Sequence, residues 1–113
     1  MTPDDTTPPT AAPSWSLIRI LRALGNQDRL SMFTIIAQAP EGLSVAQVAT
    51  RFGGKRSVVG KHLAILRSAE IVTLRTDTGD DRAAVHILHP ALRPPEGAPL
   101  VLEMGDIAIR LRA

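Results

Sequence analysis

The chain has 113 residues, of which 44% are hydrophobic, and it carries a formal net charge of +2 at pH 7. This length suits one compact domain, and the hydrophobic content excludes a wholly disordered chain. The absence of cysteine excludes disulfides, thiol catalysis and thiolate metal sites, while one tryptophan and two phenylalanines leave little for stacking on single-stranded nucleic acid.

The sequence lacks the features of a membrane protein, and its first residues lack those of a secreted protein. No stretch reaches the roughly 18 apolar residues that a membrane span requires. Residues 1–5 lack the basic and apolar regions of a signal peptide. We therefore expect a cytoplasmic protein with no membrane partner. Residues 1–13 contain four prolines among small and polar residues, so we expect them to form a disordered tail.

Two helices are predicted next, over residues 14–24 with Ser14 as the cap and over residues 26–39 with Asn26 as the cap. Gly25 and Pro40 follow them as stop signals. The first helix has a broad apolar sector, which predicts two packing partners. Either a dimer partner covers part of this sector, or the helix is buried within one subunit.

Two further helices follow. Ser44 and Gln47 form a capping box that opens a short helix ending near Phe52. A fourth helix is predicted over residues 56–69, with an apolar stripe at helical spacing made by Val59, Leu63 and Leu66. Opposite that stripe lie Ser57, Gly60, Lys61 and Ala64. A helix with a packed back and a small, polar, basic front suits the groove of a nucleic acid.

A β-hairpin is predicted from residues 71–76 and 83–88, joined by a turn rich in aspartate and glycine. A proline-rich connector begins at Pro90. We expect a domain over residues 14–90, followed by a connector and a C-terminal β segment over residues 91–113.

The segment 100–111 fits two structures. A hairpin turning at residues 105–106 places six apolar side chains on one face, by pairing Met104 with Ile107, Leu102 with Ile109, and Leu100 with Leu111. A helix would also carry an apolar stripe. Gly105 and the β-branched residues favour the hairpin. Because an isolated two-stranded hairpin is marginally stable, it must pack on the domain or on a partner.

The charge is concentrated in one part of the chain. Residues 51–75 hold six basic residues and one acid, a charge of +5, which leaves −3 for the rest of the chain. Such a concentration around one helix is typical of phosphate binding. An ordinary solvated face is the alternative.

Three segments resemble the ArsR-type winged helix-turn-helix regulators: Ala23-Leu-Gly-Asn-Gln-Asp-Arg-Leu30, Leu43-Ser-Val-Ala-Gln-Val-Ala49 and Val59-Gly-Lys-His-Leu-Ala-Ile-Leu-Arg-Ser-Ala-Glu-Ile-Val72. The resemblance covers about residues 20–90. It implies a mainly α fold with a β-hairpin wing, here followed by the C-terminal β segment. It also implies a dimeric repressor that places its fourth helix in the major groove.

The chain departs from the family pattern at several positions. Gly60 replaces a serine in the fourth helix, Lys55 replaces a small or polar cap, and Glu70 replaces a glycine after the helix. The family's cysteine metal motif is absent from residues 43–47, which excludes arsenic or cadmium sensing there. The wing tip carries acids where a phosphate-binding wing has basic residues: Asp77, Asp80 and Asp81. Either this wing stands off the DNA, or its acids pair with neighbouring arginines or with a partner.

The histidines do not predict a metal site. His62 fits a role in supporting the fourth helix, with a phosphate contact as the alternative. His86 and His89 lie three residues apart on a predicted strand, so they point to opposite faces and cannot chelate one ion together. Since the sequence also has no Gly-rich phosphate loop and no isolated acid–base pair, we predict neither an enzyme nor a cofactor.

The sequence therefore predicts a homodimeric regulator that binds double-stranded DNA, with a protein-binding winged-helix module as the alternative. Arg56 is favoured for guanine, because a guanidinium donates two hydrogen bonds to O6 and N7. The predicted DNA-binding residues are Lys55, Arg56, Ser57, Gly60, Lys61, His62, Arg67, Arg75 and Arg82. The predicted dimer contact consists of Leu17, Ile18, Leu21, Leu100, Leu102 and Ile109. The sequence does not indicate an effector.

Overall fold

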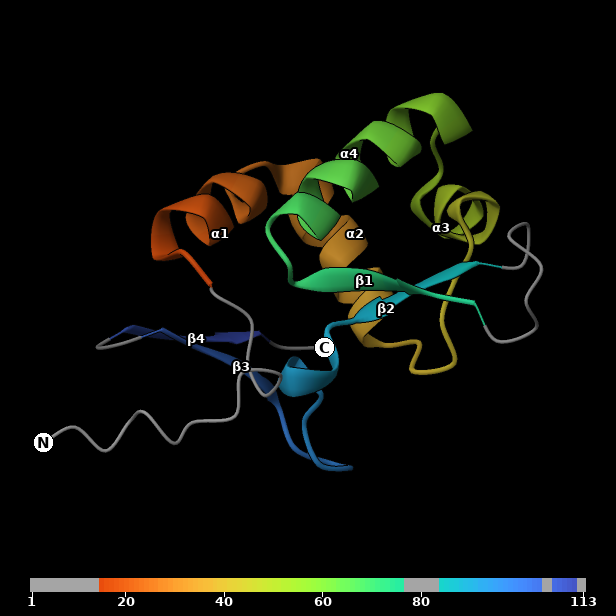
Figure 1. Ribbon diagram of the computed structural model, residues 1–113. Helices are drawn as coiled ribbons and strands as arrows, with labels where there is room; N and C mark the ends of the chain where they lie inside the picture. The colour runs from red at the N-terminus through yellow and green to blue at the C-terminus, as the bar shows by residue number, and fades with distance from the viewer. Residues whose placement is uncertain (1–14, 77–83, 105–106, 112–113) are drawn as a thin grey trace, which may run out of the picture.

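The computed structural model describes residues 15–76, 84–104 and 107–111. Four helices come first: α1 (Leu17–Leu24), α2 (Gln27–Ala37), α3 (Val45–Phe52) and α4 (Arg56–Ser68). The hairpin of β1 (Val72–Arg75) and β2 (Val85–Leu88) follows, then a short 3-10 helix (Pro90–Leu92) and the strands β3 (Leu100–Met104) and β4 (Ile107–Leu111). This element order confirms the winged helix-turn-helix prediction (Figure 1).

The helix ends agree with those predicted from the sequence, except at the start of α1 and the end of α2. The Asn26 side chain accepts a hydrogen bond from the Arg29 backbone N–H at 3.0 Å, and both bonds of the predicted capping box at the start of α3 are present. Helix α1 begins at Leu17 with Ser16 as its cap, whereas Ser14 lies outside the described residues. Helix α2 ends at Ala37, two residues earlier than predicted, because the backbone before Pro40 is disfavoured in the helical region.

The wing hairpin is antiparallel, and its strands are shorter than predicted, with Val72 opposite Leu88 and Arg75 opposite Val85. The segment before α3 extends this sheet, because Leu43 and His86 exchange backbone hydrogen bonds at 3.0 and 2.6 Å. The predicted wing tip, with Asp77, Asp80 and Asp81, lies outside the described residues, as does the predicted tail 1–13.

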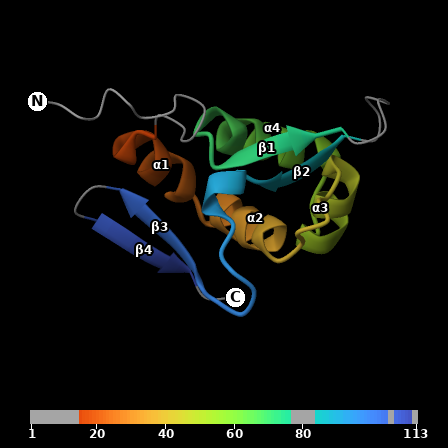
Figure 2. The same cartoon turned by 60° about the horizontal axis from the view of Figure 1, so that its bottom comes forward.

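The C-terminal segment forms the predicted hairpin with the predicted register, in which Leu100 pairs with Leu111 and Leu102 with Ile109. This hairpin packs beside α1 and α2 (Figure 2). Leu100 and Leu102 are buried in the core of their own chain. The expectation that these two leucines contact a dimer partner is therefore corrected, because both side chains are already covered within one subunit.

One hydrophobic core joins the helices, the wing and the C-terminal hairpin, and α2 contributes three of its large side chains, Met32, Phe33 and Ile36. The predicted stripe of α4 is fully buried in this core. Core packing on the back of α4 thus holds this helix in place, whereas its front is exposed. Within the described part of the chain, no helix is long and apolar enough to cross a membrane.

Candidate nucleic-acid interface

Helix α4 lies along one edge of the molecule, with α3 beside one of its ends and the wing packed below it (Figure 1). Its back is buried, whereas Ser57 and Lys61 are exposed on its front and Arg56 is exposed beside that front. A Cβ atom added at Gly60 would meet nothing within 4 Å, so the middle of this front is open. The structure therefore leaves these predicted residues accessible on the outside of the helix.

The start of α4 is the most positive part of this front. Lys55 is the N-cap residue and its side chain makes no cap hydrogen bond, and Arg56 follows as the first helical residue. Both side chains are exposed. Since a helix N-terminus carries a partial positive charge, these two cations and the helix dipole favour an anion at the same place. The sequence has no acid anywhere in residues 42–69.

His62 is half-buried and supports the helix. Its Nδ1 lies 3.3 Å from Nη1 of Arg29. The same arginine donates from Nε to the Ala23 carbonyl at 2.7 Å and from Nη2 to the Arg22 carbonyl at 3.2 Å. Arg29 thus caps the C-terminal end of α1 and holds α4 against it. Arg29 is not among the predicted site residues, although it lies in the first segment of the family resemblance.

Arg67 faces the wing. Its Nη1 donates to Nε2 of His86 at 2.8 Å. Because arginine only donates, His86 accepts at Nε2 and carries its proton at Nδ1, which is buried and has no partner among the described residues. His86 is 3% exposed, and burial lowers its pKa below the usual 6.5, with a further lowering by the charge of Arg67. This contact links α4 to β2.

The other two predicted phosphate contacts, Arg75 and Arg82, do not belong to α4. Arg75 is half-buried and donates from Nη2 to the Glu41 carbonyl at 2.7 Å, while Arg82 lies outside the described residues. His89 accepts from the Ala91 backbone N–H at 3.1 Å, so it caps the 3-10 helix and does not join His86. In the described ranges, no three side chains of the metal-binding types come together.

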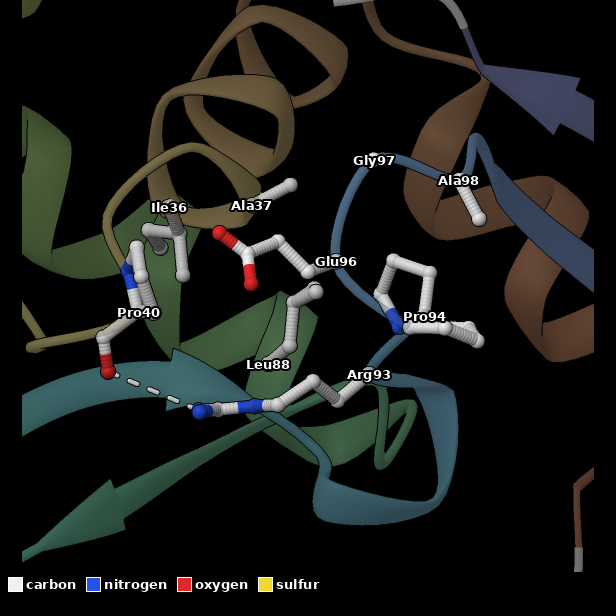
Figure 3. Close-up of a pocket in the computed structure, with 10 residues that line it drawn as sticks. Ile36, Ala37, Pro40, Leu88, Arg93, Pro94, Glu96, Gly97 and Ala98 are labelled. Atoms are coloured by element: carbon white, nitrogen blue, oxygen red, sulfur yellow. Dashed lines mark hydrogen bonds between the residues drawn. The ribbon is translucent and has the colours of Figure 1, made fainter.

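Two hollows lie on different parts of the molecule. One of about 490 Å³ is bordered by α3, α4 and the wing, including Arg56 and Arg67. The other, of about 460 Å³, lies between the end of α2, β2 and the proline-rich connector (Figure 3). Here Arg93 donates to the Pro40 carbonyl at 3.5 Å, and the Glu96 side chain points between α2 and Leu88. None of the predicted site residues lines this second hollow.

The residues of the predicted dimer contact differ in their exposure. Ile18 and Leu21 of α1 are 56% and 43% exposed, and Leu17 and Ile109 are half-buried. Ile107, which was not predicted, is 44% exposed at the start of β4. In this region, the apolar side chains that remain accessible are therefore those of α1 and of the outer part of the C-terminal hairpin.

Solved structures with the same fold include the following two proteins. Staphylococcus aureus MepR, in a complex with DNA, aligns with a TM-score of 0.54 and 14% identity over 66% of this chain and 64% of that one. Reduced HlyU from Vibrio cholerae aligns with a TM-score of 0.50 and 26% identity over 63% of this chain and 70% of that one. At 14% identity, the likeness to MepR shows the fold alone.

Comparison with curated protein sequences finds no match. Comparison with protein families matches residues 18–75 to the helix-turn-helix domain family. The matched part runs from α1 to the end of β1, and so includes the exposed front of α4. Since it spans just over half of the sequence, this chain belongs to the helix-turn-helix domain family.

Proposed function

We propose that this protein binds double-stranded DNA through α4 and regulates transcription. The observation that carries the proposal is the exposed basic front of α4, with Lys55, Arg56 and Lys61 in a stretch of sequence without acids. Neutralising phosphates requires such a concentration of cations on one element. The occurrence of the same fold in MepR, which was solved in a complex with DNA, supports this direction.

In the proposed complex, α4 enters the major groove. Arg56 donates to O6 and N7 of a guanine, and Ser57 and Lys61 contact neighbouring base edges or phosphates. Lys55 at the N-cap binds a phosphate. Arg67 donates to His86, and Arg75 donates to the Glu41 carbonyl. We therefore assign to these two arginines the positioning of the wing. Arg82 remains a predicted phosphate contact.

The proposal includes a homodimer. Exposed Ile18 and Leu21 would form its contact together with Ile107, since apolar side chains of this size are stabilised by removal from water. Two copies of α4 should then lie about 34 Å apart, one turn of DNA. Assignment to the ArsR type and a repressor role rest on the sequence resemblance, which implies both.

The test is a titration of duplex DNA with the wild-type protein and with the Arg56→Ala/Lys61→Ala variant, followed by fluorescence anisotropy at several salt concentrations. We expect the variant to lose roughly 10- to 100-fold in affinity and to show a shallower salt dependence. The charge-matched control is Arg93→Ala/Arg110→Ala, which removes two exposed arginines outside α4. Equal affinities of the α4 variant and the control would refute the proposed interface.

A protein-binding module is the second candidate, favoured by two exposed apolar side chains on α4, Val58 and Ile65. It predicts that the folded protein binds no random-sequence duplex even at low salt. The same anisotropy titration therefore separates the two functions, because sequence-independent binding to phosphates is strongest under those conditions.

A further inference from the structure

Helix α4 exposes two apolar side chains beside its basic front. Val58 is 48% exposed and Ile65 is 42% exposed. They lie seven residues apart, so they share one flank of the helix, separated by two turns. The core stripe predicted from the sequence includes neither residue, and their exposure becomes visible only in the folded chain.

Packing in the described hydrophobic core does not account for a valine at position 58. The side chain belongs neither to the buried core nor to the half-buried residues packed against it in the described structure. A β-branched residue also lowers helix propensity relative to alanine. The exposed half of this side chain therefore gains an apolar neighbour only from a binding partner.

The surroundings of Val58 restrict what that partner is. The acid-free residues 42–69 include five basic side chains. Two exposed ones, Lys55 and Lys61, lie three positions before and three positions after Val58, the spacing that places side chains next to one another on a helix. A partner that covers this region must be strongly anionic and must also present an apolar group. The major groove of DNA has both features, since the thymine C5-methyl group is the apolar group on its base edges.

We propose that Val58 contacts the C5-methyl group of a thymine in the target site, and so makes an A·T pair part of the sequence that α4 recognises. This inference rests on the proposed function. Val58 lies in the first turn of α4, and helices that read the major groove contact bases mainly through their N-terminal residues. Ile65 lies about 10 Å further along the helix, outside this region.

The experiment compares thymine with uracil, which lacks only the C5-methyl group. A duplex selected from a random pool by the wild-type protein is synthesised with thymine and with uracil at every thymine position. We expect uracil to weaken binding about fourfold for each contacted methyl group, which corresponds to about 0.8 kcal/mol. Val58→Ala should bind both duplexes with the same affinity. This variant keeps the fold, because an exposed helical position tolerates alanine.

Ile65→Ala is the matched control, since it removes a comparable exposed apolar side chain from the same flank. It should keep the wild-type preference for thymine. Equal binding of the two duplexes by the wild type, a thymine preference that survives in Val58→Ala, or an equal loss in Ile65→Ala would overturn the inference and leave DNA binding in place. Failure to bind any duplex would overturn the proposed function and this inference with it.

Discussion

The proposed DNA-binding surface and the proposed dimer surface expose different side chains. Helix α4 exposes Arg56, Ser57 and Lys61, whereas α1 and the C-terminal hairpin expose Ile18, Leu21 and Ile107. Exposed charges are well solvated and cost the folded state little, but a group of large exposed apolar side chains usually indicates a protein contact. This difference indicates that one surface suits a polyanion and the other suits a second protein surface.

Both surfaces are nevertheless built on one core. Leu63 on the back of α4 and Leu102 on the inner face of the C-terminal hairpin belong to the same cluster of buried side chains. Changes to the exposed side chains of either surface should therefore alter binding or assembly and leave stability nearly unchanged. Changes to the buried side chains beneath either surface should alter the stability of the whole domain.

The largest expected effect is that of Leu102→Ala on stability. Leu102 is 1% exposed, and truncating a buried leucine typically costs about 2–5 kcal/mol. We expect this loss in chemical denaturation followed by circular dichroism. Ile107→Ala, on the exposed part of the same hairpin, is the control and should cost much less. A wild-type unfolding curve for Leu102→Ala would show that the hairpin is not part of the cooperative core.

The next effect concerns assembly. Ile18→Asp/Leu21→Asp places two charges on the exposed face of α1, where they would be buried in the proposed dimer at a high desolvation cost. We expect a monomer of unchanged helix content by analytical ultracentrifugation. Ile65→Asp, an exposed apolar position on α4, is the control and should remain a dimer. A dimeric double variant would exclude α1 from the contact.

A smaller effect is expected at the end of α4. Glu70 has φ of 64°, and it is the only residue other than glycine with positive φ in the described part of the chain. Left-handed backbone costs a residue with a Cβ roughly 1–2 kcal/mol, and an acid at a helix C-terminus is unfavourable. Glu70→Gly should therefore stabilise the fold by about 1 kcal/mol, measured by denaturation. Glu70→Ala keeps the Cβ and should gain less; equal gains would argue against backbone strain.

The smallest expected effect is on the pH dependence of stability. The pKa of His86 is lowered by burial and by Arg67, so the unfolded chain binds a proton more readily than the folded one. Stability should therefore fall as the pH decreases through about 6.5. In His86→Gln this contribution disappears, and thermal unfolding between pH 5 and 8 should show a flatter profile than the wild type. Parallel profiles would contradict the assignment.

The sequence by itself determined most of the local structure. Asn26 and the Ser44–Gln47 pair identified helix starts, because a cap requires only neighbouring backbone N–H groups. The pairing of Leu102 with Ile109 followed from alternation along two strands and the position of a short turn. The strained position of Glu70 was also visible, as a departure from a family pattern that places glycine there.

Only the tertiary structure decided which side chains remain accessible. Leu100 and Leu102 turned inward, Arg67 turned toward His86, and Val58 stayed exposed beside the core stripe of its helix. Each outcome depends on contacts between segments far apart in the sequence, such as the contact between Arg67 and His86, which are 19 positions apart. Local patterns specify the elements, but the burial of a side chain is set by what the rest of the chain packs against it.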